Sequence, residues 1–151
     1  MSDVVVVGIG NPYRRDDGVG HVAADLVGRR SAVDVRLTDG EPTRLVDAWE
    51  NRRAAIVLDA IRRGARPGTI HRLQVGRSPL PAAFTHPSTH GAGLESAVAL
   101  GRALDRNPQT LIIYGVEPAE LAEGQGLSVA VEGSLPLLVE RVLEEVRAVC
   151  A

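Results

Sequence analysis

Cysteine is almost absent from the sequence, since Cys150 is the single residue of its kind. A lone cysteine excludes a disulfide framework and a zinc site built from cysteines, and it is typical of a protein in a reducing compartment. Aromatic residues are also scarce, at 3% of the chain. The core must therefore be built from Val, Leu, Ile and Ala, which is typical of a parallel sheet covered by helices.

Long apolar runs and an excess of positive charge are missing as well. No apolar segment approaches the ~18 residues needed to cross a bilayer, and the first residues lack the pattern of a secretory signal. The 17 basic and 19 acidic residues give a net charge of -2, with arginines spread along the chain. We therefore predict a cytoplasmic protein with no membrane partner and no nucleic-acid partner.

Buried strands alternate with helical patterns along the 151 residues, of which 44% are hydrophobic. This length and composition predict one domain over residues 1–151. Short apolar or alternating runs predict five strands, at 4–8, 33–37, 54–59, 69–75 and 110–116. Helical spacing predicts helices after Asp17, over 43–50, around Leu94 and from Ser128, with Ser134 and Pro136 opening a further segment.

The connection between the third and fourth predicted strands is too short for a parallel crossover. Only the segment RRGARPG, residues 62–68, separates the two main apolar runs. A parallel connection needs a dozen or more residues, so the fourth strand should run antiparallel to the others. The expected fold is α/β, a three-layer α/β/α sandwich with a mixed five-stranded sheet.

The loop GIGNPYRRDDGVG, residues 8–20, follows the first strand and precedes a helix. It does not fit the dinucleotide fingerprint, because Tyr13 stands where the third glycine is required. Two carboxylates, Asp16 and Asp17, would also repel a pyrophosphate at the helix N-terminus. Taken alone, either aspartate could simply be the N-cap of the helix, while Gly8 and Gly10 would shape the loop.

Three polar side chains, two carboxylates and an imidazole, are expected at one edge of the sheet. Asp17 follows the first strand, Asp59 ends a buried strand, and the loop THPSTH offers His86 and His90 before a helix. Such positions can converge beyond the carboxyl ends of the strands. Two carboxylates and an imidazole suit Zn, Ni or Fe better than Mg or Ca. A structural ion pair of Asp59 with Arg62 or Arg63 is the alternative.

Other polar residues receive simpler interpretations. Asp39, after the second strand, could reach the same crevice, whereas Glu117 after the fifth strand is expected to be structural. His21 and His71 are expected at the surface.

The segment GIGNP is similar to the GLGNP opening of bacterial peptidyl-tRNA hydrolases, but that resemblance ends after five residues. A longer pattern, G-x-G-N-P-x-x-x-D-D-G-x-G, resembles the hydrogenase maturation proteases. The resemblance continues in order through VLDAI, STHGAGL, IYGVEP and GLSVAVEGSLPLLVERVLEEV. The chain departs from the family at Glu41 and Pro42, where small residues are usual.

This resemblance implies a metal-dependent endopeptidase with a phosphorylase/hydrolase-like fold. It would remove the C-terminal extension of a nickel-iron hydrogenase large-subunit precursor after nickel insertion. Asp17, Asp59 and His90 would be both the catalytic residues and the metal ligands, and His90 is preferred to His86 because it carries the family motif. The nickel would come with the precursor, so the resting enzyme could be metal-free. A non-catalytic metal-insertion chaperone that binds the same tail, or a peptidyl-tRNA hydrolase-like esterase, is the alternative.

Overall fold

The computed structural model describes residues 2–76 and 93–151. Five strands form one sheet in the order β2-β1-β3-β5-β4. Their bounds are Val4–Ile9 for β1, Asp34–Thr38 for β2, Ala54–Ala60 for β3, Ile70–Gln74 for β4 and Thr110–Val116 for β5. The five strands correspond to the five predicted from the sequence, with small differences at their ends.

The sheet is mixed, as predicted. β1 pairs in parallel with β2 and β3, and β3 pairs in parallel with β5. β4 pairs antiparallel with β5, with Ile70 opposite Val116. The short connection after β3 is thus followed by an antiparallel strand, as expected. The carboxyl ends of the four parallel strands lie at one edge of the sheet.

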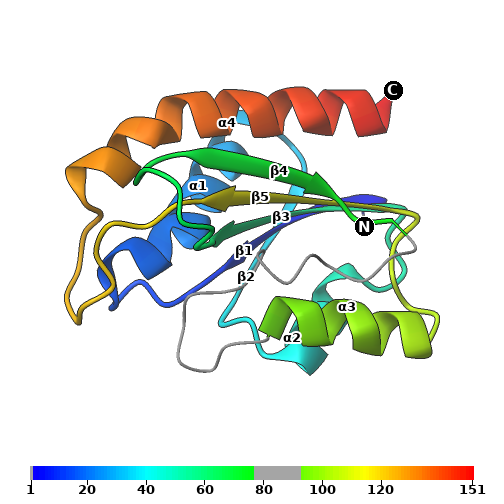
Figure 1. Ribbon diagram of the computed structural model, residues 1–151. Helices are drawn as coiled ribbons and strands as arrows, with labels where there is room; N and C mark the ends of the chain where they lie inside the picture. The colour runs from blue at the N-terminus through cyan, green and yellow to red at the C-terminus, as the bar shows by residue number, and fades with distance from the viewer. Residues whose placement is uncertain (1, 77–92) are drawn as a thin grey trace.

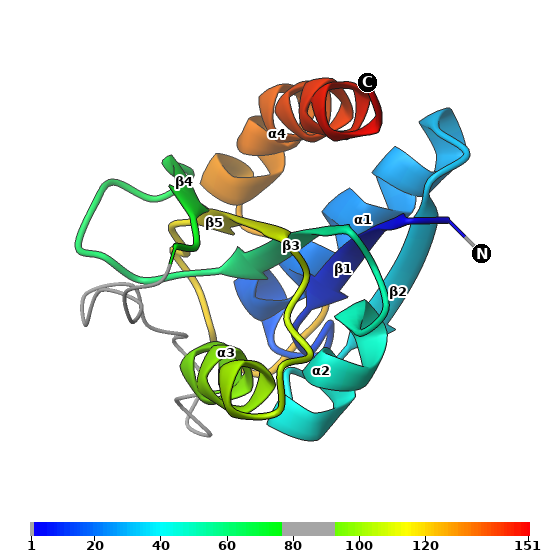
Figure 2. The ribbon, with the colours of Figure 1, turned by 90° about the vertical axis from the view of Figure 1, so that its right-hand side faces the viewer.

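Helices cover both faces of the sheet, which gives the predicted three layers (Figures 1 and 2). Helices α1 and α4 lie on one face, and α2 and α3 lie on the other. Their bounds are Val19–Arg30 for α1, Pro42–Trp49 for α2, Gly93–Ala103 for α3 and Val129–Cys150 for α4. A 3-10 helix, η1, occupies Arg15–Gly18 just before α1.

Alternate residues of the central strands point into two cores. Val6 and Ile56 pack with α1 and α4, whereas Val5 and Val57 pack with Trp49 and the residues of α2 and α3. Every residue of β1 and β3 is buried. This explains why these strands are continuous apolar runs without alternation. In the described part of the chain, no helix is long and apolar enough to cross a membrane.

The last helix differs from its prediction. Ser134 and Pro136 do not open a second segment, because α4 continues through both residues. The Ser134 Oγ donates a hydrogen bond to the Val131 carbonyl oxygen at 2.6 Å. Buried residues occur on both sides of the proline, Leu135 before it and Leu138 after it. Packing of this continuous apolar face on the sheet therefore maintains the helix despite the proline.

Candidate active site at the carboxyl ends of the strands

The loop after β1 folds back on η1 at a glycine. Gly10 has φ +142°, a conformation that favours glycine. A Cβ atom at this position would also lie 1.8 Å from the carbonyl oxygen of Asp17. The Gly10 amide donates to the Thr38 carbonyl oxygen at 3.0 Å, which attaches the loop to the end of β2. The expected role of Gly10 in shaping the loop is thus confirmed.

Asp17 lies in η1 and is buried, with 2% of its surface exposed. Its Oδ2 accepts a hydrogen bond from the backbone amide of Asn11 at 2.9 Å. The interpretation of Asp16 or Asp17 as an N-cap is wrong, because Gly18 caps α1 and no side chain accepts a capping bond there. The Asp17 carboxylate instead hydrogen-bonds back to the loop after β1.

Asp59 lies near the carboxyl end of β3 and has only 1% of its surface exposed. The start of α1 packs directly over this end of the strand, since a Cβ atom on Gly20 would lie 2.3 Å from the Leu58 carbonyl oxygen. η1 also contacts β3. The structure therefore places Asp59 near the end of β3 and Asp17 in the 3-10 helix that follows the neighbouring β1.

His90 and His86 lie outside the described residues, so the proposed imidazole ligand stays a prediction. Gly93, the first residue of α3, packs against Gly40 after β2. A Cβ atom at position 93 would lie only 2.3 Å from the Gly40 carbonyl oxygen. A Cβ atom at Gly40 would in turn lie 2.9 Å from the Ile9 Cγ2 atom. Helix α3 thus begins at the same edge of the sheet. Within residues 2–76 and 93–151, no three His, Cys, Asp or Glu side chains form a group that could hold a metal.

Asp16 has a role that the sequence analysis missed. It is fully buried, and its carboxylate accepts hydrogen bonds of 2.8 Å from the amides of Ala119 and Glu120. It also accepts bonds from Ser128, from the amide at 2.7 Å and from the hydroxyl at 2.8 Å. The hydrogen bonds of Asp16 therefore hold the segment after β5 against the loop that carries Asp17. The signal in the sequence was the second aspartate of the D-D pair, for which helix capping was the only structural role predicted.

Glu117 joins the loop after β3 to the end of β5 and to β4, which confirms the expected structural role. Its buried carboxylate accepts hydrogen bonds from the amides of Arg63 at 2.9 Å and Ala65 at 3.2 Å, and contacts His71 Nε2 at 3.0 Å. Burial alone would raise the pKa of the Glu117 carboxyl, but these hydrogen bonds outweigh it and leave the pKa below its ordinary value. His71 is mostly buried, so its predicted surface position is wrong.

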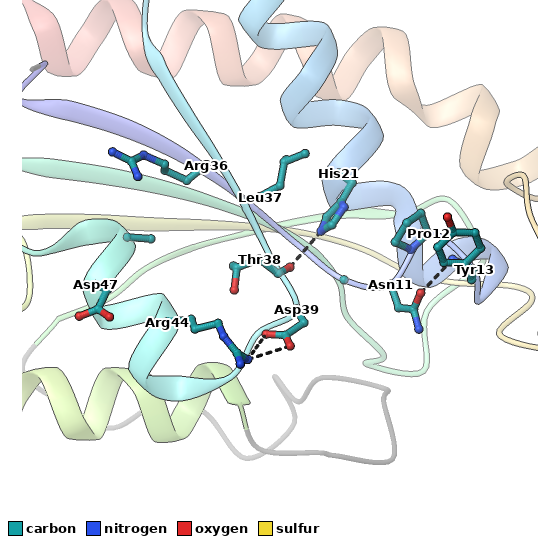
Figure 3. A pocket seen from close by; sticks show the side chains of 12 residues that line it. Asn11, Pro12, Tyr13, His21, Arg36, Leu37, Thr38, Asp39, Arg44 and Asp47 are labelled. Atoms are coloured by element: carbon teal, nitrogen blue, oxygen red, sulfur yellow. Dashed lines mark hydrogen bonds and ion pairs between the residues drawn. The ribbon is translucent and has the colours of Figure 1, made fainter.

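A pocket of about 630 Å³ adjoins the loop after β1 (Figure 3). Loop residues from Gly10 to Tyr13 form one side, and residues of β2 and α2 form the others. His21, which was expected at the surface, is partly buried here, and its Nε2 donates to the Thr38 carbonyl oxygen at 2.9 Å. The pocket thus meets the site at Asn11, whose amide hydrogen-bonds Asp17.

Asp39 lines this pocket, so it does reach the carboxyl edge of the sheet. Its carboxylate pairs with Arg44 at 2.9 Å and is largely exposed. The Glu41 amide and the Arg44 guanidinium hold the pKa of Asp39 below its ordinary value. Glu41 also caps α2, because its side chain accepts hydrogen bonds from the amides of Thr43 and Arg44. The glutamate that departs from the family pattern therefore has a structural use in this chain.

Comparison with known proteins identifies the chain. The family model of hydrogenase maturation proteases matches residues 21–145. The hydrogenase expression/formation protein HupD of Thiocapsa roseopersicina is 30% identical over 147 residues, which are 94% of this chain and 66% of that protein. The hydrogenase 2 maturation protease of Escherichia coli K12 is 29% identical over 150 residues, covering 95% of this chain and 90% of that protein.

A solved structure agrees with both comparisons. The hydrogenase maturating endopeptidase HybD from Escherichia coli superposes with a TM-score of 0.83 at 27% identity, covering 98% of this chain and 93% of that one. The chain spans about two thirds of the length of the Thiocapsa relative, 66%, and nearly the whole of the Escherichia coli structure. With 125 residues inside the family model, from 21 to 145, the chain belongs to the hydrogenase maturation protease family.

Proposed function

We propose that this protein is the endopeptidase that removes the C-terminal extension of a nickel-iron hydrogenase large-subunit precursor after nickel insertion. The observation that carries the proposal is the burial of Asp17 and Asp59 at the ends of neighbouring strands, in a chain of the maturation protease family. Carboxylate oxygens at this edge of the sheet are groups that a metal cation brought by the substrate could bind.

Nickel in the precursor is, in this proposal, part of the substrate. Asp17, Asp59 and His90 would engage it, and a mixed set of oxygen and nitrogen ligands suits nickel. The bond from the Asn11 amide to Asp17 Oδ2 fixes the carboxylate in one orientation before the substrate arrives. A bound nickel ion can polarise a carbonyl group or activate water. A carboxylate of the pair would accept a proton from the attacking water.

The direct test compares two forms of one precursor. The purified protein should shorten a nickel-loaded large-subunit precursor and leave the nickel-free form intact, as measured by intact-mass spectrometry. Cleavage of both forms at equal rates would contradict nickel recognition. Binding of the loaded precursor without any cleavage would instead favour a chaperone that holds the same tail.

Substitutions then test whether the three residues act together. Asp17→Asn, Asp59→Asn and His90→Ala should each reduce processing by about a hundredfold or more, because groups that act as one unit fail together. An asparagine at position 17 can still accept the Asn11 amide through its carbonyl oxygen, so the melting temperature should hold. His86→Ala and the exposed Asp25→Asn are the controls. Full processing by Asp17→Asn or His90→Ala would refute the shared site.

A further inference from the structure

The free edge of the sheet at β2 leads to the proposed active site. We propose that this edge and the adjoining pocket bind an extended segment of the hydrogenase precursor, which pairs with β2 as an added strand. The proposal rests on the proposed function and specifies how the substrate chain reaches Asp17. Three features of the described residues support it: main-chain groups that point outward, a pocket continuous with the site, and exposed apolar side chains.

Main-chain groups of β2 point alternately toward β1 and away from it. Ile9 lies opposite Thr38, and the Thr38 carbonyl oxygen accepts from the Gly10 amide. In a parallel ladder, the residues next to such a position direct their N–H and C=O groups to the other side. Leu37 and Val35 therefore present both groups at the outer edge. β2 is the first strand in the sheet order, and no described strand pairs with it there.

The pocket connects this edge to the active-site loop. Arg36, Leu37 and Thr38 line one end of it, and Gly10 and Asn11 line the other. Since the Asn11 amide is hydrogen-bonded to Asp17, a chain that follows β2 through the pocket arrives beside the carboxylate.

Two large apolar side chains project into solvent along the same path. Tyr13 is 64% exposed and Leu37 is 53% exposed, and both line the pocket (Figure 3). Strand addition obtains affinity from main-chain hydrogen bonds and specificity from alternate side chains. The expected occupant is thus an extended segment of the precursor with an apolar side chain that covers Leu37 and Tyr13. The neighbouring side chains Arg36 and Asp47 offer one charge of each sign to its polar residues.

A proline substitution tests the edge without disturbing the ladder. Leu37→Pro removes a donor that points outward, and proline is accepted on edge strands in that orientation. The matched control is Gln74→Pro on β4, at the opposite edge. Val75 donates to the Leu111 carbonyl and Thr69 accepts from the Glu117 amide, so the alternating Gln74 directs its N–H away from β5.

Steady-state processing of the nickel-loaded precursor gives the measurement. Leu37→Pro should raise KM about tenfold or more and leave kcat within about twofold, the pattern of lost uniform binding. Tyr13→Ser, at an exposed loop position, should also raise KM. Gln74→Pro should retain the KM of the unsubstituted protein. If Leu37→Pro fails to fold, Tyr13→Ser alone decides, and an unchanged KM in that variant overturns the proposal.

The results also separate this proposal from the proposed function. A protein that leaves the loaded precursor uncut would overturn both. Normal processing by the unsubstituted protein, with the same KM in Leu37→Pro and Tyr13→Ser, would overturn the strand addition alone. The other possible occupant of the edge is a second copy of the chain, which sedimentation of the free protein tests. If the protein is a dimer, and Leu37→Pro dissociates it without any change in KM, the edge binds a second copy and the proposal is overturned.

Discussion

Two adjacent aspartates in this protein have opposite surroundings. Asp16 has its carboxylate enclosed by the amides of Ala119, Glu120 and Ser128 and by the Ser128 hydroxyl. Asp17 faces the other way and accepts the Asn11 amide. The 3-10 geometry of η1 turns successive side chains apart, so one residue fixes the loop and its neighbour serves the proposed site.

Removal of the Asp16 side chain should destabilise the whole protein. Asp16→Ala leaves three backbone amides and a hydroxyl without their acceptor in a buried region, and each unsatisfied donor costs about 1–3 kcal/mol. We expect the free energy of unfolding to fall by about 3 kcal/mol or more, as measured by urea denaturation. Asp25→Ala removes an exposed carboxylate paired with Arg29 and should cost about 0.5 kcal/mol or less. Equal losses in the two variants would refute the role given to Asp16.

Within the elements, two helical glycines should respond to alanine with opposite signs. Gly20 in α1 lies so close to the sheet that a Cβ atom would stand 2.3 Å from the Leu58 carbonyl oxygen and 2.4 Å from that of Ile9. Gly133 in α4 is exposed, and no atom lies within 4 Å of its Cβ position. Gly20→Ala should destabilise, whereas Gly133→Ala should stabilise by about 0.5–1 kcal/mol through helix propensity.

Thermal unfolding of the two variants, followed by circular dichroism, checks this pair. A higher melting temperature for Gly20→Ala would show that α1 can move away from the sheet. A lower melting temperature for Gly133→Ala would contradict the solvent-facing position of that residue.

The elements that the sequence predicted best are those determined by local pattern. The strands follow from apolar runs, and the antiparallel direction of β4 follows from the short connection after Asp59. The capping of α1 by Gly18 and the continuity of α4 were missed because tertiary contacts decide them. Pro136 leaves the Glu132 carbonyl without its helical donor, but Glu132 is exposed to water, and the buried face beyond the proline keeps packing on the sheet.

The position of the site could be predicted from the sequence, but the hydrogen bonds that hold its loop in place could not. Strand ends located Asp17 and Asp59, since the carboxyl ends of parallel strands meet at one edge. The partners of Asp16 are separated from it by 103 to 112 residues, and no spacing rule relates positions so far apart. His90, the third residue of the predicted site, lies outside the described residues and stays a prediction.

At the scale of the whole molecule, buried carboxylates join loops at the carboxyl edge of the sheet. Asp16 joins the loops after β1 and β5, and Glu117 joins the loop after β3 to the end of β5 and to His71. Glu117 must be ionised to accept hydrogen bonds from all of its donors. The stability of the molecule should therefore depend on acid pH.

The direction of that dependence follows from Glu117. Its folded-state pKa lies below the ordinary value of 4.5, so ionised Glu117 stabilises the fold above about pH 4.5, and the stabilisation is lost as the pH falls through the folded-state pKa. Glu117→Gln should lower stability at neutral pH and make it less dependent on pH below that point. Urea titrations between pH 7 and pH 3 measure both effects, with the exposed Glu132→Gln as control. An unchanged slope in Glu117→Gln would contradict this assignment.

The long reach of the Asp16 carboxylate also sets an order of events during synthesis. Ser128 follows Asp16 by 112 residues, and ribosomes add about 5–20 residues per second. For several seconds the nascent chain thus carries the loop of Asp17 without the amides that enclose its neighbour. A chain truncated before residue 119 therefore lacks every donor that encloses the Asp16 carboxylate. The loop that carries Asp17 is thus attached to the segment after β5 only in a nearly full-length polypeptide.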